Sequence, residues 1–273
     1  MSLKISDLTM LHGDCAVLLK TLDSESIDLV VCSPPYADQR KGKYEGVPAD
    51  KYVDWFLPIG HELKRVLKPT GSFMLNIKAH CDEGERNLYV MDLVLALKRQ
   101  IEFCYVDEYC WYKSASPRRK SFRLKNAWEP VYHFALGRSF IDHDAIKVFS
   151  KSTFANKRGT TCYDKKSGNV GGYHDIADQA PGWTDPDNML YFPTSLLVKD
   201  GKFPHPAKFP RELVEFLVKG FSPNGGVVLD PFMGSGMTAL ASLLQKRKCI
   251  GIEREEKFVE MAWERIRSFD APQ

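Results

Sequence analysis

The stretch Val227-Val-Leu-Asp-Pro-Phe-Met-Gly-Ser-Gly-Met-Thr238 decides how the chain folds. A short apolar run ends in Asp230, passes through Gly234 and Gly236, and continues into the helix-patterned residues 238–244. This order is typical of a buried parallel strand that leads into a crossover helix. Ligands in open α/β sheets lie at the carboxyl ends of the strands, and glycines let them approach the backbone. The stretch therefore predicts an α/β fold with a ligand site at this turn.

The next predicted strand, residues 248–252, ends in another acid, Glu253. An acid at this place is suited to accept hydrogen bonds from a ribose diol. Two acids and two glycines together predict a nucleoside site, although a single glycine-rich turn is often only a tight turn. The spacing is not that of a dinucleotide fingerprint, and no Lys-Ser/Thr pair ends it as in a phosphate-binding loop.

Length and composition limit the classes of protein to consider. A chain of 273 residues can bury one sizeable core with an added lobe. The hydrophobic fraction of 44% and the lack of a long apolar run predict a soluble protein, and residues 1–5 do not begin a secretion signal. The seven cysteines are scattered, which predicts reduced thiols in a cytoplasm, and no metal is expected because no Cys-x-x-Cys pair or His cluster occurs. A net charge of +3 is too small to establish nucleic-acid binding by itself.

A second chemical motif follows a strand in the first half of the chain. The predicted strand 27–32 runs directly into Ser33-Pro34-Pro35-Tyr36. Two consecutive prolines stiffen the turn and fix the directions of the Ser33 hydroxyl and the Pro34 carbonyl. Tyr36 is then a plate on which a base rotated out of a duplex can stack. Alone, the stretch would indicate no more than a proline-stiffened turn with a half-buried tyrosine.

The remaining segments alternate between the two hydrophobic periodicities. Residues 8–14 form a predicted strand that ends at Asp14, which either caps the helix that follows or serves the site. Further strands are predicted at 72–77, 102–112 and 128–134, the last beside the Tyr36 turn, and further helices at 16–22, 50–66, 88–98, 211–218 and 255–269. The aromatic residues of the 50–66 helix are interpreted as core.

Two basic loops are candidates for contact with nucleic acid. Residues 37–46 are polar and basic, which suits a loop that closes over DNA. Residues 113–125 carry six basic side chains and no acid, which by itself is equally compatible with a loop that lies on phosphates and with a solvated loop. The candidate DNA-binding residues are Arg40, Lys41, Lys43, Arg118, Arg119, Lys120, Arg123 and Lys125.

The two motifs together resemble a known family. Ser-Pro-Pro-Tyr at 33–36 and Asp-Pro-Phe-x-Gly-Ser-Gly-x-Thr at 230–238 are similar to the signatures of the β-class, circularly permuted DNA amino-methyltransferases, which use S-adenosylmethionine. His205-Pro-Ala-Lys-Phe-Pro210 is similar to the family motif ahead of the cofactor loop. The resemblance covers most of the chain outside roughly residues 145–200. It implies a Rossmann-like methyltransferase sheet, mostly parallel with one antiparallel strand, circularly permuted, and interrupted by a target-recognition region.

The resemblance also implies roles for individual residues. The catalytic turn would be Ser33, Pro34, Pro35 and Tyr36. The cofactor site would comprise an acid near the adenine, the motif ahead of the loop, the loop itself and the acid after the next strand: Asp14, Lys208, Phe209, Pro210, Asp230, Pro231, Phe232, Gly234, Ser235, Gly236, Thr238 and Glu253.

The chain divides into two halves of one catalytic domain around an insertion. Residues 1–141 carry the Ser-Pro-Pro-Tyr motif and residues 202–273 carry the cofactor loop. Residues 142–201 between them have few apolar runs and many Lys, Gly, Asn, Asp and Pro. Their place matches the target-recognition region of the family, and polar side chains on irregular backbone can reach base edges.

The reaction that these motifs predict needs little acid–base power. The lone pair of an exocyclic amino nitrogen is delocalised into the ring, whereas the cofactor's methyl group is already activated. Hydrogen bonds to the Ser33 hydroxyl and the Pro34 carbonyl would turn that lone pair toward the methyl group, so that positioning drives the transfer. Cys32 precedes Ser33 at a strand end predicted to be buried, so a covalent adduct of the carbon-5 type is not expected.

The target base and the partners follow from the resemblance. Ser-Pro-Pro-Tyr is similar to the cytosine-N4 enzymes, whereas Asp-Pro-Pro-Tyr is usual for adenine-N6. Some cytosine-N4 members carry an acid at the position of Asn76 that assists the serine, so its absence leaves adenine N6 open. An RNA or small-molecule methylase and an inactive nucleotide-binding regulator are further alternatives. Double-stranded DNA is the expected partner in a bacterial or phage-encoded cytoplasmic enzyme, without a membrane, and a homodimer or a cognate restriction endonuclease is compatible with the resemblance.

Overall fold

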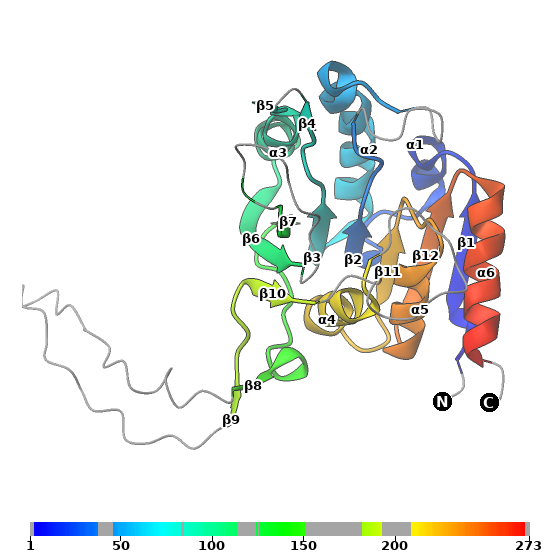
Figure 1. Ribbon diagram of the computed structural model, residues 1–273. Coiled ribbons are helices and arrows are strands. Elements are labelled where there is room, and N and C mark those ends of the chain that lie inside the picture. The colour runs from blue at the N-terminus through cyan, green and yellow to red at the C-terminus, as the bar shows by residue number, and fades with distance from the viewer. Residues whose placement is uncertain are drawn as a thin grey trace, which may run out of the picture. The chain divides into compact units, whose positions relative to one another are not determined.

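One eight-stranded sheet organises the molecule (Figure 1). The computed structural model describes residues 3–37, 46–82, 85–113, 124, 126–150, 182–192 and 209–270. The strands lie in the order β1-β12-β11-β2-β3-β7-β6-β10. Their bounds are β1 (Leu8–His12), β2 (Ile27–Cys32), β3 (Leu67–Asn76), β6 (Cys104–Tyr112), β7 (Trp128–Ala135), β10 (Met189–Tyr191), β11 (Val227–Asp230) and β12 (Lys248–Glu253).

The strand directions confirm the predicted Rossmann-like sheet. Among these eight strands, only β7 runs against the others, because it pairs antiparallel with both β3 and β6. All the remaining pairs in the sheet are parallel. Two strands from the C-terminal part of the chain lie inside the sheet, because β11 and β12 separate β1 from β2. The two ends of the chain therefore build one sheet together, as the circular permutation requires.

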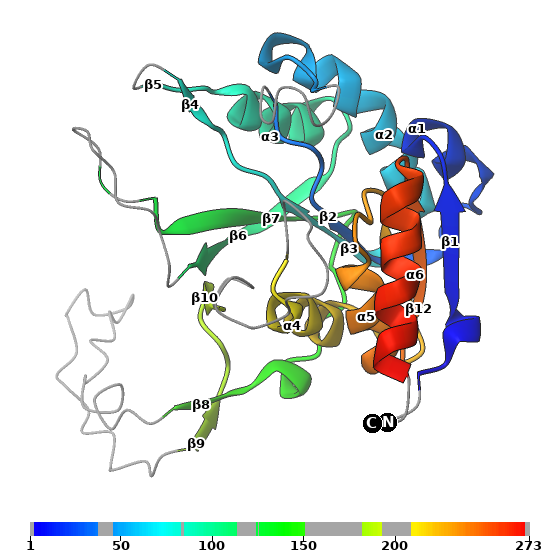
Figure 2. The ribbon, with the colours of Figure 1, turned by 45° about the vertical axis from the view of Figure 1, so that its right-hand side comes forward.

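Helices cover both faces of the sheet (Figures 1 and 2). The side chains of α1 (Cys15–Leu18), α2 (Tyr52–Val66) and α3 (Tyr89–Arg99) pack into one apolar core. Those of α4 (Arg211–Phe221), α5 (Met237–Leu244) and α6 (Glu256–Asp270) pack into a second core on the other face. Strand β2 serves both cores, with Val30 in the first and Leu29 and Val31 in the second. This alternation follows from the two-residue period of a strand, and it explains why residues 27–32 are all buried.

Strand β3 begins earlier than the sequence predicts. Its pairing with β2 starts at Ile27↔Leu67 and resumes at Leu29↔Ser72, so the residues between Leu67 and Ser72 bulge from the ladder. Lys68, in the bulge, donates a hydrogen bond from Nζ to Asp28 Oδ2 at 2.8 Å. The helix ends before the Lys-Pro-Thr-Gly stretch, as predicted, and this stretch lies between the first pairing of the strand, at Leu67, and the second, at Ser72.

Short elements complete the described residues. Single turns of 3-10 helix are η1 (Ile5–Asp7), η2 (Leu19–Thr21), η3 (Ala49–Lys51) and η4 (Asp144–Ile146). Two small antiparallel pairs are β4 (Cys81–Asp82) with β5 (Glu85–Arg86), and β8 (Val148–Ser150) with β9 (Gly182–Thr184). No helix in the described part of the chain is long and apolar enough to cross a membrane.

The chain separates into two compact units. Residues 143–187 form the smaller unit, in which β8 pairs with β9 and the rings of Phe149 and Trp183 lie 5.8 Å apart. The larger unit contains the rest, including β10, which pairs with β6 in the main sheet. The assignment of residues 142–201 to target recognition stays a prediction.

Candidate active site

Two strand ends bring the sequence motifs together. Strands β2 and β11 are parallel neighbours, with Leu29 paired to Val228 and Val30 paired to Leu229. Parallel neighbours end at the same edge of a sheet, so the turn after β2 and the loop after β11 lie at one edge. The structure thus places Ser33–Tyr36 beside the glycine-rich loop.

Asp230 closes the glycine-rich loop upon itself. Its Oδ1 accepts a hydrogen bond from the Phe232 backbone N–H at 2.9 Å, and its Oδ2 accepts one from Thr238 Oγ1 at 2.5 Å. The side chain is buried, and burial raises the pKa of the carboxyl to about 7 against the two hydrogen bonds that lower it. The sequence predicts Asp230 and Thr238 as cofactor-binding residues. In the structure, their side chains hold the loop in shape.

Terminal helix α6 supports the same loop from behind. Gly236 has φ +80°, and a Cβ atom there would lie 2.7 Å from Ala262 Cβ. Buried Arg265 donates from Nε to the Ser235 carbonyl at 2.7 Å and from a terminal nitrogen to Ser235 Oγ at 3.3 Å. Sequence reasoning missed Arg265, because charged residues of an amphipathic terminal helix ordinarily face solvent.

Two further acids lie at the ends of β12 and β1. Glu253 accepts hydrogen bonds from the backbone N–H of Gly234 at 2.8 Å and of Glu255 at 2.9 Å. An ionised carboxylate offers about four acceptor positions, so this side chain retains capacity for a ligand. Asp14 accepts from the Ala16 N–H at 2.7 Å and caps α1, which is the alternative that the sequence left open.

This edge of the sheet offers groups that suit a nucleoside. Glu253 and exposed Asp14 provide acceptors for hydroxyl or amino groups. Half-buried Phe232 offers an aromatic surface, and its ring lies 5.9 Å from that of Trp55 on α2. The sequence assigned Trp55 to the core alone, and only the packing of α2 against the loop after β11 reveals its second contact. These acceptors and this aromatic ring fit the cofactor that the motif predicts.

The Ser-Pro-Pro-Tyr turn is anchored by two helices. Tyr52 on α2 donates its hydroxyl to the Pro35 carbonyl at 2.7 Å. Tyr89 on α3 accepts from the Ala37 N–H at 3.3 Å and donates to the Lys78 carbonyl at 3.2 Å. The two tyrosine rings lie 4.7 Å apart. Pro34 is buried between these anchors, while Ser33 and Tyr36 stay half-buried.

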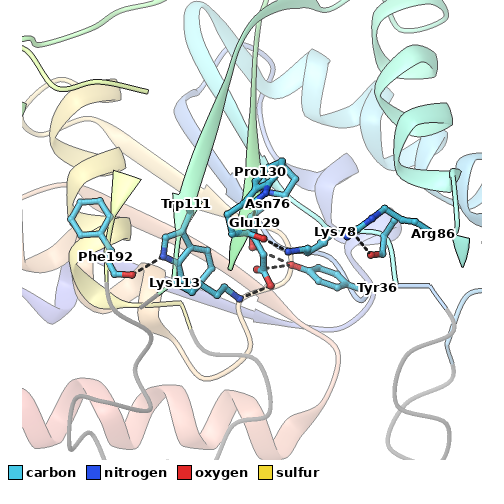
Figure 3. Close-up of polar contacts among 11 residues, drawn as sticks. Tyr36, Asn76, Lys78, Arg86, Trp111, Lys113, Glu129, Pro130 and Phe192 are labelled. Atoms are coloured by element: carbon cyan, nitrogen blue, oxygen red, sulfur yellow. Dashed lines mark hydrogen bonds and ion pairs between the residues drawn. The ribbon is translucent and has the colours of Figure 1, made fainter. Parts of the chain in front are cut away.

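A polar cluster surrounds the Tyr36 hydroxyl (Figure 3). This hydroxyl lies 3.2 Å from Asn76 Oδ1 and 3.5 Å from Glu129 Oε2. Glu129 is ion-paired with Lys113, and Lys78 donates to the Trp128 carbonyl. Burial, and then the charge of Glu129, raises the pKa of Tyr36 well above its ordinary value, while a hydrogen bond from Ser33 lowers it.

Sequence reasoning placed the 128–134 strand beside the Tyr36 turn but missed the side chains that face it. Glu129 lies in an aromatic strand and would ordinarily point to solvent. Lys78 is buried, and burial lowers its pKa to about 8. One signal could have revealed Glu129. Lys113 follows one predicted strand and Glu129 lies near the start of the next, and the two face each other because Trp111 pairs with Glu129 across β6 and β7.

The remaining residues that the sequence singles out have the following positions. Phe209 is half-buried with its ring 6.3 Å from Trp111, and Pro210 precedes α4. Pro231 is buried at the start of the loop. Cys32 is fully buried, and burial raises the pKa of its thiol, which agrees with a structural role. Lys208 and the predicted DNA-binding residues Arg40, Lys41, Lys43, Arg118, Arg119, Lys120, Arg123 and Lys125 lie outside the described residues.

Metal ligands do not gather anywhere in the described ranges, where no three His, Cys, Asp or Glu side chains could share an ion. Neighbouring acids instead bind backbone N–H groups, as Asp230 and Glu253 do.

Comparison with known proteins identifies the class. The model of the N6/N4 methyltransferase family, described as DNA methylase, matches residues 27–264. The match contains both motifs and the strands that carry them. The chain therefore belongs to this family, and it is a DNA methyltransferase of the amino-directed N4/N6 type.

Individual relatives cover nearly the whole chain. The type II methyltransferase M.PvuII of Proteus hauseri is 29% identical over 280 residues, covering 93% of this chain and 82% of the relative. The DNA adenine methyltransferase YhdJ of Escherichia coli (strain K12) is 27% identical over 264 residues, covering 94% and 82%.

Two solved structures share the fold. The cytosine-N4-specific PvuII DNA methyltransferase superposes with a TM-score of 0.72 at 24% identity, covering 97% of this chain and 93% of that one. TTHA0409 of Thermus thermophilus, a putative DNA modification methylase complexed with S-adenosyl-L-methionine, gives a TM-score of 0.64 at 21% identity, covering 95% and 93%. These likenesses agree with the sheet order described above.

Proposed function

We propose that this enzyme transfers a methyl group from S-adenosylmethionine to the N4 amino group of a cytosine flipped out of double-stranded DNA. The observation that carries the proposal is the adjacency of β2 and β11. It supports one reaction space at the edge of the sheet, with the base held by residues 33–36 and the cofactor by the loop after Asp230.

The turn after β2 would orient the amino group. Ser33 Oγ and the Pro34 carbonyl accept its two hydrogens, which turns the nitrogen lone pair out of the ring plane. Tyr36 stacks on the base and fixes its plane. The contacts of Pro35 with Tyr52 and of Ala37 with Tyr89 support a turn rigid enough for this task. Bound S-adenosylmethionine supplies a methyl group that is already activated for displacement.

The cofactor would be held by groups at the ends of three strands. Glu253 accepts hydrogen bonds from the ribose hydroxyls, and Asp14 lies near the adenine. Phe232 packs against the cofactor, and the backbone at Gly234 and Gly236 allows close approach. Asp230, Ser235 and Thr238 keep the loop in its shape. Lys208, Phe209 and Pro210 approach the methionine and adenine ends, as the family resemblance implies.

Cytosine is favoured over adenine by the first residue of the turn. Ser33 stands where adenine-N6 enzymes usually carry Asp, and the solved PvuII enzyme is titled cytosine-N4-specific. Adenine N6 is the alternative, supported by the similarity to YhdJ, whose name states adenine. Both amino groups present the same hydrogens to Ser33 and Pro34, so one geometry serves either base.

The partners follow from the reaction. Residues 142–201 would read base edges, and the basic residues of 37–46 and 113–125 would contact phosphates. The type II relatives support pairing with a restriction endonuclease, with this enzyme protecting the host DNA. We propose a bacterial or phage-encoded enzyme that acts in the cytoplasm, and a homodimer is compatible with the family resemblance.

A direct assay tests the function and the base together. The enzyme is incubated with labelled S-adenosylmethionine and unmethylated genomic DNA, and the digested nucleosides are identified by mass spectrometry. We expect N4-methylcytosine. N6-methyladenine would identify adenine as the target base, and DNA without any methylated nucleoside would overturn the assignment to DNA.

A pair of variants tests whether Tyr36 contacts the base. Tyr36→Ala should weaken binding of the flipped base by about 1–3 kcal/mol, the usual worth of base stacking on an aromatic ring, and should leave cofactor affinity unchanged. Tyr105→Phe, which alters an exposed tyrosine on β6, is the control. Undiminished turnover in Tyr36→Ala would remove Tyr36 from the site.

A further inference from the structure

Three exposed aromatic side chains, called the aromatic row below, lie side by side at one edge of the sheet. Tyr112 ends β6, Tyr191 ends β10, and Trp128 begins β7. Tyr191 is paired with Tyr112 across β10 and β6, and Tyr112 is paired with Trp128 across β6 and β7. Paired residues of neighbouring strands point to the same face of a sheet, so the three side chains form one line. The rings of Tyr112 and Tyr191 are 5.7 Å apart.

The hydrophobic core does not account for the aromatic row. Trp111 and Leu190, which precede Tyr112 and Tyr191 in the chain, are buried in the second core. Side chains alternate along a strand, so the row points to the opposite face of the sheet. There Tyr112, Trp128 and Tyr191 are 40%, 43% and 68% exposed. Single exposed apolar side chains are ordinary, whereas adjoining ones form a patch of the kind that binds a partner.

The aromatic row lies at the same edge of the sheet as the candidate active site (Figures 1 and 2). Strands β3 and β6 both run antiparallel to β7, so they point in one direction, which β2 and β10 share. Tyr112 and Tyr191 therefore end at the edge where Ser33–Tyr36 follows β2. Neighbouring strands lie about 4.8 Å apart, so the row begins about 10 Å from that turn, which is the length of about three stacked nucleotides.

Positive charge accompanies the aromatic row. The ammonium group of Lys78 donates a hydrogen bond to the Trp128 carbonyl and lies 5.7 Å from the centre of the Trp128 ring. Lys113 directly follows β6 and is ion-paired with Glu129, so one acid lies beside two lysines there (Figure 3). In the sequence, residues 113–125 between β6 and β7 include six basic residues and no acid. An anionic partner matches this charge.

A nucleic-acid strand combines the two chemistries that this surface can recognise. Aromatic rings stack on every base because every base has a π face, and lysines beside them attract phosphates. An apolar protein surface would cover the rings but would leave the lysines without an anionic partner. Rotation of the target base out of the duplex, which the proposed function requires, also breaks its stacking on the neighbouring bases. The faces of those bases then become open to other rings.

We propose that the aromatic row of Tyr112, Trp128 and Tyr191 binds DNA by stacking on bases that flank the target base, while the target base itself lies at Ser33–Tyr36. The row is a binding site and takes no part in methyl transfer. The inference rests on the proposed function in that the ligand is DNA, and it extends that function from the flipped base to the strand beside it. Stacking uses ring faces and not base edges, so the row adds affinity with little sequence preference.

Two oligonucleotides of equal length and charge separate stacking from attraction to phosphates. One is a single strand of thymidines, and the other has the same backbone without bases. Fluorescence anisotropy with the full-length protein, at several salt concentrations, measures both affinities. The wild type should bind the thymidine strand about tenfold or more tightly than the abasic strand, because each base that stacks on a ring adds affinity.

Alanine variants locate this preference. Trp128→Ala, Tyr112→Ala and Tyr191→Ala should each lower the preference for thymidines by about fivefold, the low end of the usual loss for one stacked base. The slope of log K against log salt should stay as in the wild type, because an uncharged ring releases no counterions from the phosphates. Tyr112→Phe and Tyr191→Phe lose a hydroxyl and keep the ring, so they should retain the preference.

The same strand provides a matched control. Tyr105 is 40% exposed, as Tyr112 is, but it lies near the other end of β6. Tyr105→Ala should therefore bind both oligonucleotides as the wild type does. If Trp128→Ala fails to fold, Tyr191→Ala decides, because its side chain is the most exposed of the three and its loss leaves the core intact.

An unchanged preference for thymidines in all three alanine variants would overturn the inference. Alanine variants that keep this preference but change their oligomeric state in sedimentation would identify the row as a protein contact and would also overturn it. Failure of the proposed function has a different signature. A wild type that binds thymidines through the row but methylates no DNA would refute the function alone, and a wild type that binds neither strand would refute both.

Discussion

Three acids at strand ends look alike in the sequence and differ in the structure. Asp14, Asp230 and Glu253 each follow a predicted strand, and each was assigned to the cofactor. In the folded chain, Asp230 is buried and both of its oxygens accept hydrogen bonds within its own loop, Glu253 connects two loops, and Asp14 caps a short helix. A carboxylate near a strand end meets backbone N–H groups first, and only the loop geometry decides how much of it faces a ligand.

Replacement of Glu253 by glutamine tests its role toward the cofactor. Both carboxylate oxygens accept backbone N–H groups, whereas an amide must direct its NH₂ group at one of these donors. We expect Glu253→Gln to weaken S-adenosylmethionine binding by about 1–3 kcal/mol in calorimetry. Glu256→Gln, an exposed acid in the first turn of α6, is the control. Equal cofactor affinity in the two variants would show that Glu253 does not bind the cofactor.

Asp230 predicts a pH dependence of stability. Because its folded pKa of about 7 lies above the ordinary 3.8, the folded protein holds this proton more tightly than the unfolded chain does. The stabilisation is complete below the ordinary pKa and is lost as the pH rises through 3.8 to about 7. Asparagine cannot ionise, so Asp230→Asn should gain stability relative to the wild type over this window, by at most roughly 4 kcal/mol.

Chemical denaturation at about pH 4 and about pH 8 measures this difference, because the two values bracket the titration. Asp23→Asn, at an exposed position, should show no such gain. A constant difference between Asp230→Asn and the wild type at both pH values would mean that Asp230 is ionised throughout.

At the scale of elements, the helices do more than cover the sheet. The sequence predicts α2 as a helix with aromatic core residues and α3 as a helix with an apolar face, and the packing confirms the prediction for Phe56 and Leu63 of α2. It does not predict that the Tyr52 and Tyr89 hydroxyls bind the backbone of a turn far away in sequence. A tyrosine on an apolar face satisfies the same hydrophobic pattern as a phenylalanine, so the periodicity carries no information about its hydroxyl.

The contact of α6 with the cofactor loop leaves no room for a side chain at position 236. Gly236→Ala places a Cβ atom 2.7 Å from Ala262 Cβ in a backbone conformation of φ +80°. We expect a loss of roughly 1–3 kcal/mol in unfolding free energy, measured by thermal or chemical denaturation, together with weaker cofactor binding. Gly137→Ala is the matched control, because no atom lies within 4 Å of its added Cβ and it has no positive φ. Equal stability of the two variants would show that α6 yields at this contact.

At the scale of the whole molecule, the order of the strands brings the two motifs of the site together. Strand β11, from the end of the chain, lies between β12 and β2, so its loop lies beside a turn from the beginning of the chain. The periodicity of the sequence predicts each strand but not its neighbour, because hydrophobic patterns do not record which edges pair. The family resemblance implied a circularly permuted sheet, mostly parallel with one antiparallel strand, and the structure confirms that sheet and adds the order of its strands.

The basic loops belong to this scale as well, because DNA must cross the face that carries the site. Each Lys or Arg that contacts a phosphate releases condensed counterions, so neutralisation of Arg118, Arg119 and Lys120 should flatten the slope of log K against log salt by up to about 3. Affinity should fall for all DNA sequences alike, as measured by fluorescence anisotropy. Substitutions within 142–201 should instead lower discrimination between sites and leave the slope nearly unchanged.

Neutralisation of exposed Lys20, Lys98 and Arg99 changes the net charge by the same amount and is the control. If the triple change in 118–120 leaves the salt slope as it was, DNA crosses another surface of the protein.

By itself, the sequence determined the types of the main elements, the α/β class and the two motifs, whose resemblance to a known family then implied the amino-directed reaction. These follow from local patterns: apolar periodicity defines a strand or helix, and two prolines or two glycines restrict a turn wherever it lies. Only the tertiary structure decided that Glu129 faces Tyr36, that Arg265 supports Ser235 and that Tyr52 anchors Pro35. These contacts join residues of different elements, and a side chain's partners depend on strand order and helix packing, which no local pattern contains.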